Sequence, residues 1–285
     1  MNDREDLIET ITRRVLAELD RDPEKECGDC EGSCASHCPD KVRVMVEEGA
    51  VRIGYNGRGG DIPADIASYI DHTLLKPGAT GPEIDRLCEE ARRYNFAAVC
   101  VNPVWVRRAR ENLRGSNVGI ASVVGFPLGA NSTEIKVMEA RRALREGARE
   151  IDMVINVGLL KEGDYEAVGK DIARVADACR EVGAVCKVII EAGLLSDEEK
   201  VVACQLSKEA KANYVKTSTG FGAGGATVYD VALMRETVGP SMGIKASGGI
   251  KTTEDAEQMI AAGATRIGAS AGISIIGGNG DGNGE

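Results

Sequence analysis

Residues 186–218, CKVIIEAGLLSDEEKVVACQLSKEAKANYVKTS, contain two short apolar runs on either side of an amphipathic stretch. The same alternation continues in both directions along the chain. Short runs rich in valine and isoleucine recur at 71–75, 97–102, 118–126, 151–156, 186–192, 214–218, 243–247 and 265–269. Strands that are buried on both faces are apolar throughout, and their alternation with helices indicates parallel pairing.

Eight such strand–helix units over residues 63–276 predict an α/β fold, a TIM (β/α)8 barrel. A doubly wound open sheet is the alternative from the pattern alone. It is less favoured because no G-x-G-x-x-G follows the first apolar run. Little apolar sequence remains after Ile276, so we expect a short last helix and a disordered glycine-rich tail at 277–285.

The composition limits the partners of the protein. A formal net charge of −10 and a pI near 5.0 argue against nucleic acid or an anionic membrane. No apolar stretch reaches the roughly 18 residues that a membrane span needs. Residues 1–20 carry acids throughout and lack a continuous apolar core, so we expect them not to be a secretory signal. Scattered cysteines in apolar sequence are typical of the reduced thiols of a cytoplasmic enzyme. They are Cys88, Cys100, Cys179, Cys186 and Cys204.

Several charged residues lie inside or at the ends of the expected strands, where a buried charge must be paired or functional. They are Asp71, Asp152, Lys187, Glu191, Lys216 and Lys245. Lys216 and Lys245 belong to neighbouring strands, about 4.8 Å apart. Mutual repulsion and desolvation would keep one amine neutral and nucleophilic. The alternative is a structural pair of lysines satisfied by Asp152 and Glu191.

Glycine-rich turns follow the last three expected strands, as STGFG at 218–222, SGGIK at 247–251 and GAS at 268–270. Such turns expose backbone N–H groups, and a phosphate site near the last strands is common in TIM barrels. These glycines therefore predict a phosphate site, with a role as plain turn formers as the alternative. His72 adjoins Asp71, but strand alternation points it away from the interior, so we expect it to be structural.

At these residues the sequence resembles the deoxyribose-phosphate aldolase family, the class I or Schiff-base aldolases. The resemblance covers about residues 66–275. It rests on the segments IDHTLLKP, VCVNP, SVVGFPLG, EIDMVINVGLLKEGDYE, CKVIIEAGLL, YVKTSTGFG, GIKASGGIKT and RIGAS, which follow one another in family order.

The resemblance implies roles for three catalytic residues. Lys216 in KTSTG matches the lysine that forms the Schiff base. Lys245 in IKASGG matches a second lysine that lowers the pKa of the first and joins a proton relay. Asp152 in EIDMVI matches the acidic partner in that relay.

The same resemblance implies substrate contacts. Asp71 and Thr73 match positions that support the substrate hydroxyls and a catalytic water, and Cys100 matches a cysteine that lines the pocket. The phosphate cradle is matched by Gly220, Gly248, Gly249 and Ser270. Two departures stand out: the tail has no tyrosine, and Phe221 stands where some relatives have a lysine.

The implied reaction is the reversible cleavage of 2-deoxy-D-ribose 5-phosphate to D-glyceraldehyde 3-phosphate and acetaldehyde. Catalysis needs no cofactor, because the iminium itself accepts the electrons of the broken bond. The small-molecule partner is therefore a sugar phosphate, and a homo-oligomer is a further expectation. The alternatives are another Schiff-base sugar-phosphate aldolase and a non-catalytic protein that carries metal or docks on a microcompartment shell.

Residues 1–20 predict an amphipathic helix, since Leu7, Ile8, Ile11, Val15 and Leu19 share one face. This helix resembles the encapsulation peptides of bacterial microcompartment enzymes, which implies a shell protein as partner and an encapsulated location within the cytoplasm. The alternative is a helix that packs on the barrel or on a neighbouring subunit.

Residues 21–62 form a cysteine-rich linker in this interpretation. Cys27, Cys30, Cys34 and Cys38 have the spacing C-x2-C-x3-C-x3-C-P, one residue longer than the bacterial ferredoxin run. Four soft ligands so close together predict a zinc or iron–sulfur site with a structural, regulatory or docking role. The alternative is a redox-sensitive linker without metal.

Overall fold

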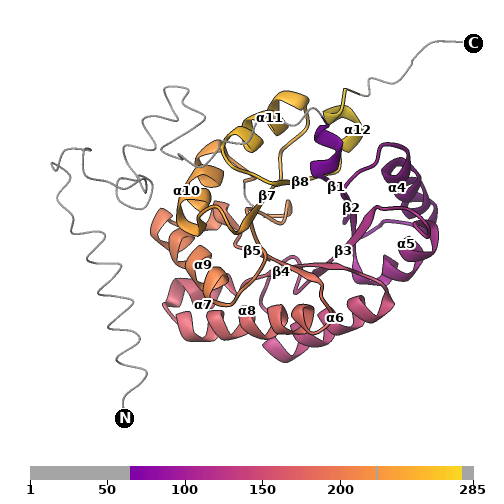
Figure 1. Cartoon of the computed structure of the whole chain (residues 1–285). Helices are drawn as coiled ribbons and strands as arrows, with labels where there is room; N and C mark the ends of the chain where they lie inside the picture. The colour runs from indigo at the N-terminus through magenta and orange to yellow at the C-terminus, as the bar shows by residue number, and fades with distance from the viewer. Residues whose placement is uncertain (1–64, 223, 278–285) are drawn as a thin grey trace, which may run out of the picture.

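The structure, a computed structural model, describes residues 65–222 and 224–277, which form a ring of helices around a closed ring of strands (Figure 1). All eight strands are parallel and pair in chain order, with the last closing on the first. They are β1 (Ile70–Leu74), β2 (Ala98–Val101), β3 (Gly119–Val124), β4 (Glu150–Val154), β5 (Val185–Ile189), β6 (Tyr214–Lys216), β7 (Gly243–Ser247) and β8 (Arg266–Ala269). The TIM barrel prediction is confirmed, and the open sheet is excluded.

Helices cover the outside of the barrel between successive strands (Figure 1). The α-helices are α4 (Gly81–Arg93), α5 (Val106–Asn112), α6 (Thr133–Glu146), α7 (Val157–Glu162), α8 (Tyr165–Arg180), α9 (Asp197–Glu209), α10 (Val228–Val238), α11 (Thr253–Ala261) and α12 (Gly272–Ile275). Short 3-10 helices are η1 (Ile66–Tyr69), η2 (Pro103–Trp105) and η3 (Ala192–Leu194). The last helix is short, as expected. No described helix is both long and apolar enough to cross a membrane.

Local sequence signals explain where the helices begin. At α9, the Ser196 hydroxyl accepts a hydrogen bond from the Glu199 amide, and the Glu199 carboxylate accepts one from the Ser196 amide. Thr252 and Asp255 form the same reciprocal pair at α11. Each cap satisfies amides that have no partner within the helix and contributes about 1 kcal/mol.

The buried hydrophobic residues that the structure describes form one large core and two smaller clusters. The larger core lies between the strands and the outer helices and includes most of the buried valine, isoleucine and leucine side chains. A smaller cluster consists of Leu75, Cys100, Ala121 and Val123, with Phe126 packed against it. Because β2 and β3 supply three of the four residues of this inner cluster, that side of the interior is largely apolar.

The register of the other strands places charged residues side by side. Lys216 on β6 is the Cα partner of Lys245 on β7. Asp152 on β4 is the Cα partner of Lys187 on β5. One side of the barrel interior is therefore charged, and the side chains there must neutralise one another.

The predictions for residues 1–20 and 21–62, including the four clustered cysteines, lie outside the described residues, as does the tail from 278. Within the described part of the chain, no group of three or more His, Cys, Asp or Glu side chains could hold a metal ion.

Candidate active site

The candidate nucleophile Lys216 ends β6 and is almost completely buried, with an exposed fraction of 2%. Its Nζ atom donates to Asp152 Oδ2 at 2.9 Å. The same carboxylate oxygen accepts a hydrogen bond from Lys245 Nζ at 2.7 Å. The structure therefore brings together the three residues that the sequence analysis assigned to the chemistry, with Asp152 as the bridge between the two lysines.

The two lysines differ in the direction of their pKa shifts. Burial lowers the pKa of Lys216, and the neighbouring Lys245 cation lowers it further, against the opposing effect of Asp152. Burial also disfavours the cation of Lys245, but Asp152 and Asp71 together raise the pKa of Lys245 above its ordinary value. Lys245 is thus the group that stays an ammonium, and Lys216 is the one that can lose its proton.

Asp71 on β1 completes the support of Lys245, since its Oδ2 accepts a hydrogen bond from the Lys245 ammonium. The Lys245 side chain reaches β1 by passing over Gly268, where an added Cβ would lie 2.8 Å from Lys245 Cε. Burial would raise the pKa of Asp71, but Lys187, Lys245 and Arg266 hold it well below the ordinary value. Asp71 is therefore a carboxylate that acts on the second lysine rather than on Lys216.

Three further charged residues belong to this network and were not assigned to the site from the sequence. Lys187 Nζ donates to Asp152 Oδ1 at 2.8 Å and forms an ion pair with Glu150. Arg266 Nη1 donates to Asp71 Oδ1 at 2.7 Å. Glu150 precedes Asp152 by two residues and so points to the same face, which was an available signal. The contact between Arg266 and Asp71 depends on barrel closure and had no such signal.

Glu191 is not a partner of the lysines, so the structural alternative based on Asp152 and Glu191 is wrong for Glu191. Its carboxylate accepts the Thr219 amide at 3.2 and 3.4 Å. β5 ends at Ile189, and Glu191 has a left-handed backbone with φ 55°. Strand alternation no longer applies there, and Glu191 instead holds the loop after β6.

The predicted substrate contacts on β1 and β2 differ in what they offer. Cys100 is fully buried in the small inner apolar cluster, and burial raises the pKa of its thiol. It is the Cα partner of Thr73 on β1. The Thr73 hydroxyl donates a hydrogen bond to the carbonyl oxygen of Asp71 at 2.7 Å. Both residues border the charged cluster from its apolar side.

The predicted phosphate residues follow the last three strands and lie on one rim of the barrel. Gly220, Gly248 and Gly249 have φ values of 82°, 90° and 84°, which favour glycine. The loops after β6 and β7 touch, since the Ala226 amide donates to the Gly248 carbonyl at 2.9 Å. Gly220, Gly249 and Ser270 are exposed, so their backbone groups are accessible at this rim.

Two aromatic contacts complete the surroundings. Phe221, which is half exposed, meets Phe126 edge-on with the ring centroids 5.4 Å apart. Phe221 therefore borders the apolar side of the interior and supplies no cation to a phosphate. His72 lies outside the barrel, where Nε2 is 2.7 Å from Glu90 Oε2 and the ring packs 5.0 Å from that of Phe96. The expectation of a structural His72 agrees with this placement.

Comparisons with known proteins give one consistent result. Residues 66–278 match the family model described as DeoC/LacD family aldolase. A deoxyribose-phosphate aldolase of Brevibacillus brevis is 60% identical over 208 residues, which cover 73% of this chain and 93% of that protein. One from Thermococcus gammatolerans is 60% identical over 214 residues, with 74% and 95% covered.

A solved structure agrees with the sequence relatives. The deoxyribose phosphate aldolase of Aeropyrum pernix, described as having a unique tetrameric structure, superposes with a TM-score of 0.71. It is 36% identical and covers 74% of this chain and 89% of its own. A TIM barrel with these relatives is a barrel enzyme of the aldolase class. More narrowly, the chain belongs to the DeoC/LacD aldolase family.

Proposed function

We propose that the protein cleaves 2-deoxy-D-ribose 5-phosphate reversibly to D-glyceraldehyde 3-phosphate and acetaldehyde. The observation that carries the proposal is a buried lysine, Lys216, whose pKa is lowered beside a second lysine whose pKa is raised. The relatives at about 60% identity bear the name of this activity. The substrate assignment rests on them, and the chemistry rests on the lysine pair.

In the first step, the neutral Lys216 amine attacks the C1 aldehyde of the open-chain sugar, and loss of water leaves an iminium. Asp152 lies within hydrogen-bonding distance of both Lys216 and Lys245, so the three side chains form one chain of contacts. They are thus placed to supply and remove the protons that carbinolamine formation and dehydration require. A neighbouring carboxylate also stabilises the cationic iminium as it forms.

In the second step, a base takes the proton of the C3 hydroxyl and the C2–C3 bond breaks. Its electron pair enters the iminium, which becomes a neutral enamine while glyceraldehyde 3-phosphate departs. The enamine then takes a proton at C2, and water releases acetaldehyde and the free Lys216 amine. Asp152, Lys245 and an ordered water would carry these protons. The apolar cluster around Cys100 and Val123 suits the two-carbon fragment, which has no charge.

The phosphate end of the substrate would lie at the rim formed by Gly220, Gly248, Gly249 and Ser270. Backbone amides of left-handed glycines form concave sites that favour anions. Because Phe221 brings no charge to this rim, phosphate binding would depend on backbone donors and the Ser270 hydroxyl.

Trapping the imine tests the proposal. Protein incubated with deoxyribose 5-phosphate and borohydride should gain one reduced adduct, mapped to Lys216 by mass spectrometry and missing from Lys216→Leu. Release of acetaldehyde from this substrate, compared with a panel of other sugar phosphates, distinguishes the proposed activity from that of another Schiff-base aldolase. An adduct on a different lysine would refute the assignment.

We also propose a role in targeting for residues 1–20, in a microcompartment inside the cytoplasm, on the amphipathic sequence pattern alone. Deleting these residues should spare turnover but abolish association with a shell protein. Cys27, Cys30, Cys34 and Cys38 would hold zinc or an iron–sulfur cluster that does not serve catalysis. Anaerobically purified protein should contain stoichiometric metal, and changing the four cysteines to serine should remove it.

A homo-oligomer is a further proposal, supported by the tetrameric relative of Aeropyrum pernix. Light scattering on the full chain would give the mass in solution directly. A monomer at micromolar concentration would contradict it.

A further inference from the structure

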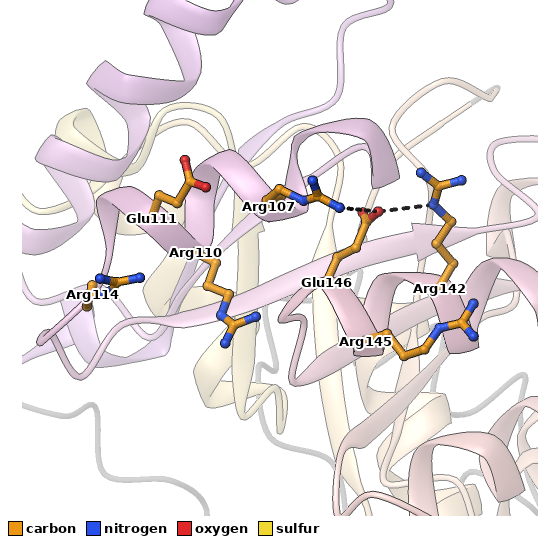
Figure 2. A pocket seen from close by; sticks show the side chains of 7 residues that line it. All are labelled: Arg107, Arg110, Glu111, Arg114, Arg142, Arg145 and Glu146. Atoms are coloured by element: carbon orange, nitrogen blue, oxygen red, sulfur yellow. Dashed lines mark hydrogen bonds and ion pairs between the residues drawn. The ribbon is translucent and has the colours of Figure 1, made fainter.

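A second cationic site lies on the outside of the barrel, between α5 and α6 (Figure 2). It is a hollow of about 600 Å3 lined by five arginines and two glutamates. They are Arg107, Arg110, Glu111, Arg114, Arg142, Arg145 and Glu146. Cations thus exceed anions by three in a protein whose net charge is −10. None of the residues of the candidate active site lines this hollow.

Most of the arginine charge in the hollow has no protein partner among residues 65–222 and 224–277. Glu146 alone bridges two of the arginines, at 3.1 Å from Arg142 and 3.8 Å from Arg107 (Figure 2). The described part of the chain offers no hydrogen bond or ion pair to Arg110, Arg114 or Arg145. Arg110 and Arg145 lie in the last turns of α5 and α6, where a cation interacts favourably with the helix dipole. This role explains only two of the five arginines.

Other arginines on the same two helices are paired. Arg108 on α5 forms a bidentate contact with Asp85, at 2.7 and 2.6 Å. Arg141 on α6 donates to both carboxylate oxygens of Glu181, at 3.0 and 3.1 Å. On α5 and α6, therefore, only arginines that face the hollow lack a carboxylate partner among the described residues.

The backbone makes room for one of these arginines. Gly147, just after α6, has φ 128°, and an added Cβ would lie 2.4 Å from Arg110 Cδ. The Arg110 stem therefore crosses from α5 against the bare backbone of Gly147. This contact restricts the side chain and holds its guanidinium within the hollow.

We propose that this hollow is a binding site for a small metabolite that carries two or more phosphate groups, separate from the active site. Guanidinium groups bind phosphate oxygens through paired N–H donors, and five of them surround one space. A single phosphate ester carries at most about two negative charges, fewer than the excess here. A cavity of this volume also falls in the usual range for small-molecule sites, roughly 300–1,000 Å3.

Nucleic acid does not suit the same site. A nucleic-acid surface needs a basic track that follows many phosphates, whereas these arginines are confined to one hollow on an acidic protein. The ligand is therefore a compact anion, and its affinity should fall strongly as the salt concentration rises.

The test uses the full chain and inorganic tripolyphosphate, with inorganic phosphate for comparison, by calorimetry at constant ionic strength. Arg110→Gln with Arg145→Gln removes two charges from the hollow. Arg141→Gln with Arg174→Gln removes the same charge elsewhere, since Arg174 is an exposed partner of Glu134. We expect the first pair to weaken tripolyphosphate binding by about tenfold or more, and the second by no more than about twofold.

Several results would overturn the proposal. These are a wild type that binds tripolyphosphate no better than phosphate, equal weakening by both pairs, or no weakening by the first pair. Tripolyphosphate could also inhibit the retro-aldol reaction competitively. If the first pair of substitutions leaves that inhibition unchanged, tripolyphosphate binds at the active site instead. Thermal denaturation checks that both double variants are folded. If the first double variant does not fold, the single variant Arg145→Gln takes its place in the binding measurement.

Discussion

The barrel interior and the hollow between α5 and α6 both gather cations, but they treat them in opposite ways. Inside, Lys187, Lys216 and Lys245 are buried, and each lies beside Asp152. Outside, Arg142 is 71% exposed, and its neighbours Arg110 and Arg145 lack carboxylate partners among the described residues. Water screens the outer charges, whereas the low dielectric of the interior makes every unpaired charge costly.

The comparison shows which charged groups can change their protonation state and which can only bind an anion. The pKa of a buried lysine shifts because the surrounding charges and the loss of hydration determine which protonation state is more stable. An exposed arginine remains a cation and can only bind. Substitutions in the two regions should therefore differ greatly in effect, and the following predictions run from the largest to the smallest.

Replacing Lys216 should have the largest effect. Lys216→Leu removes the proposed nucleophile, and we expect retro-aldol turnover to fall by about 10⁴-fold or more, as for other covalent catalysts. The assay is acetaldehyde release at saturating deoxyribose 5-phosphate. Lys170→Leu on the exposed face of α8 is the matched control and should keep full activity. Substantial turnover by Lys216→Leu would remove the basis of the comparison.

Replacing the second lysine should change the pH profile as well as the rate. Lys245→Met removes a proton-transfer group, so we expect a fall of about 10²–10⁴-fold in kcat/KM. It also removes the cation that lowers the Lys216 pKa and leaves Asp152 to favour the charged amine. The rising limb of kcat/KM against pH should therefore move to higher pH. A limb that stays in place would show that burial alone sets the Lys216 pKa.

Asp152→Asn should damage folding because three buried lysine side chains share this carboxylate. We expect a loss of about 3–5 kcal/mol in the free energy of unfolding, measured with urea at pH 7. The matched change Asp177→Asn breaks an exposed pair with Arg180 and should cost about 1 kcal/mol or less. Equal losses would mean that the interior charges are hydrated.

The lowered pKa of Asp152 implies that the free energy of unfolding decreases in acid. Lys187, Lys216 and Lys245 hold the pKa of Asp152 well below its ordinary value, against the opposing effect of burial. The unfolded chain then binds more protons between the two pKa values, so unfolding free energy rises with pH across that window. The contribution is complete above the ordinary Asp pKa, about 3.9, and is lost as the pH falls. Asp152→Asn should remove this part of the acid dependence.

Arg266 should act through its neighbour. Arg266→Ala leaves Asp71 with only the lysines as partners, so its carboxylate and Lys245 should shift position. We expect kcat to fall by about 10–100-fold with little change in KM. Arg266→Lys keeps a cation on Asp71 and should recover part of the rate. An unchanged kcat in Arg266→Ala would show that Asp71 is held by Lys187 and Lys245 alone.

The smallest effect is expected in the hollow. Glu146→Gln breaks the contacts with Arg142 and Arg107, which are exposed and screened. Unfolding free energy should change by about 0.5 kcal/mol or less, with turnover unaffected. The measurement is urea denaturation beside Asp152→Asn. A loss as large as that of Asp152→Asn would erase the distinction between the two regions.

The sequence alone determined the barrel and singled out the three residues that meet at the centre of the candidate site. Apolar runs that alternate with amphipathic stretches leave few architectures, because each strand must be covered on both faces. Lys216, Lys245 and Asp152 stand out since a charge in an apolar run needs an explanation. Strand alternation also separated Asp71 from His72 correctly, as a period of two requires.

Only the tertiary structure decided which charge faces which. Asp71 and Arg266 are 195 residues apart, and they meet because β8 closes on β1. Glu191 does not face the lysines because β5 ends before it, and the position where a strand ends depends on packing around the rim. The arginines of the hollow likewise come from α5, α6 and the turn after α5, and no local pattern encodes how these segments meet. Periodicity specifies the face of each element, but long-range partners follow only from how the elements close and pack.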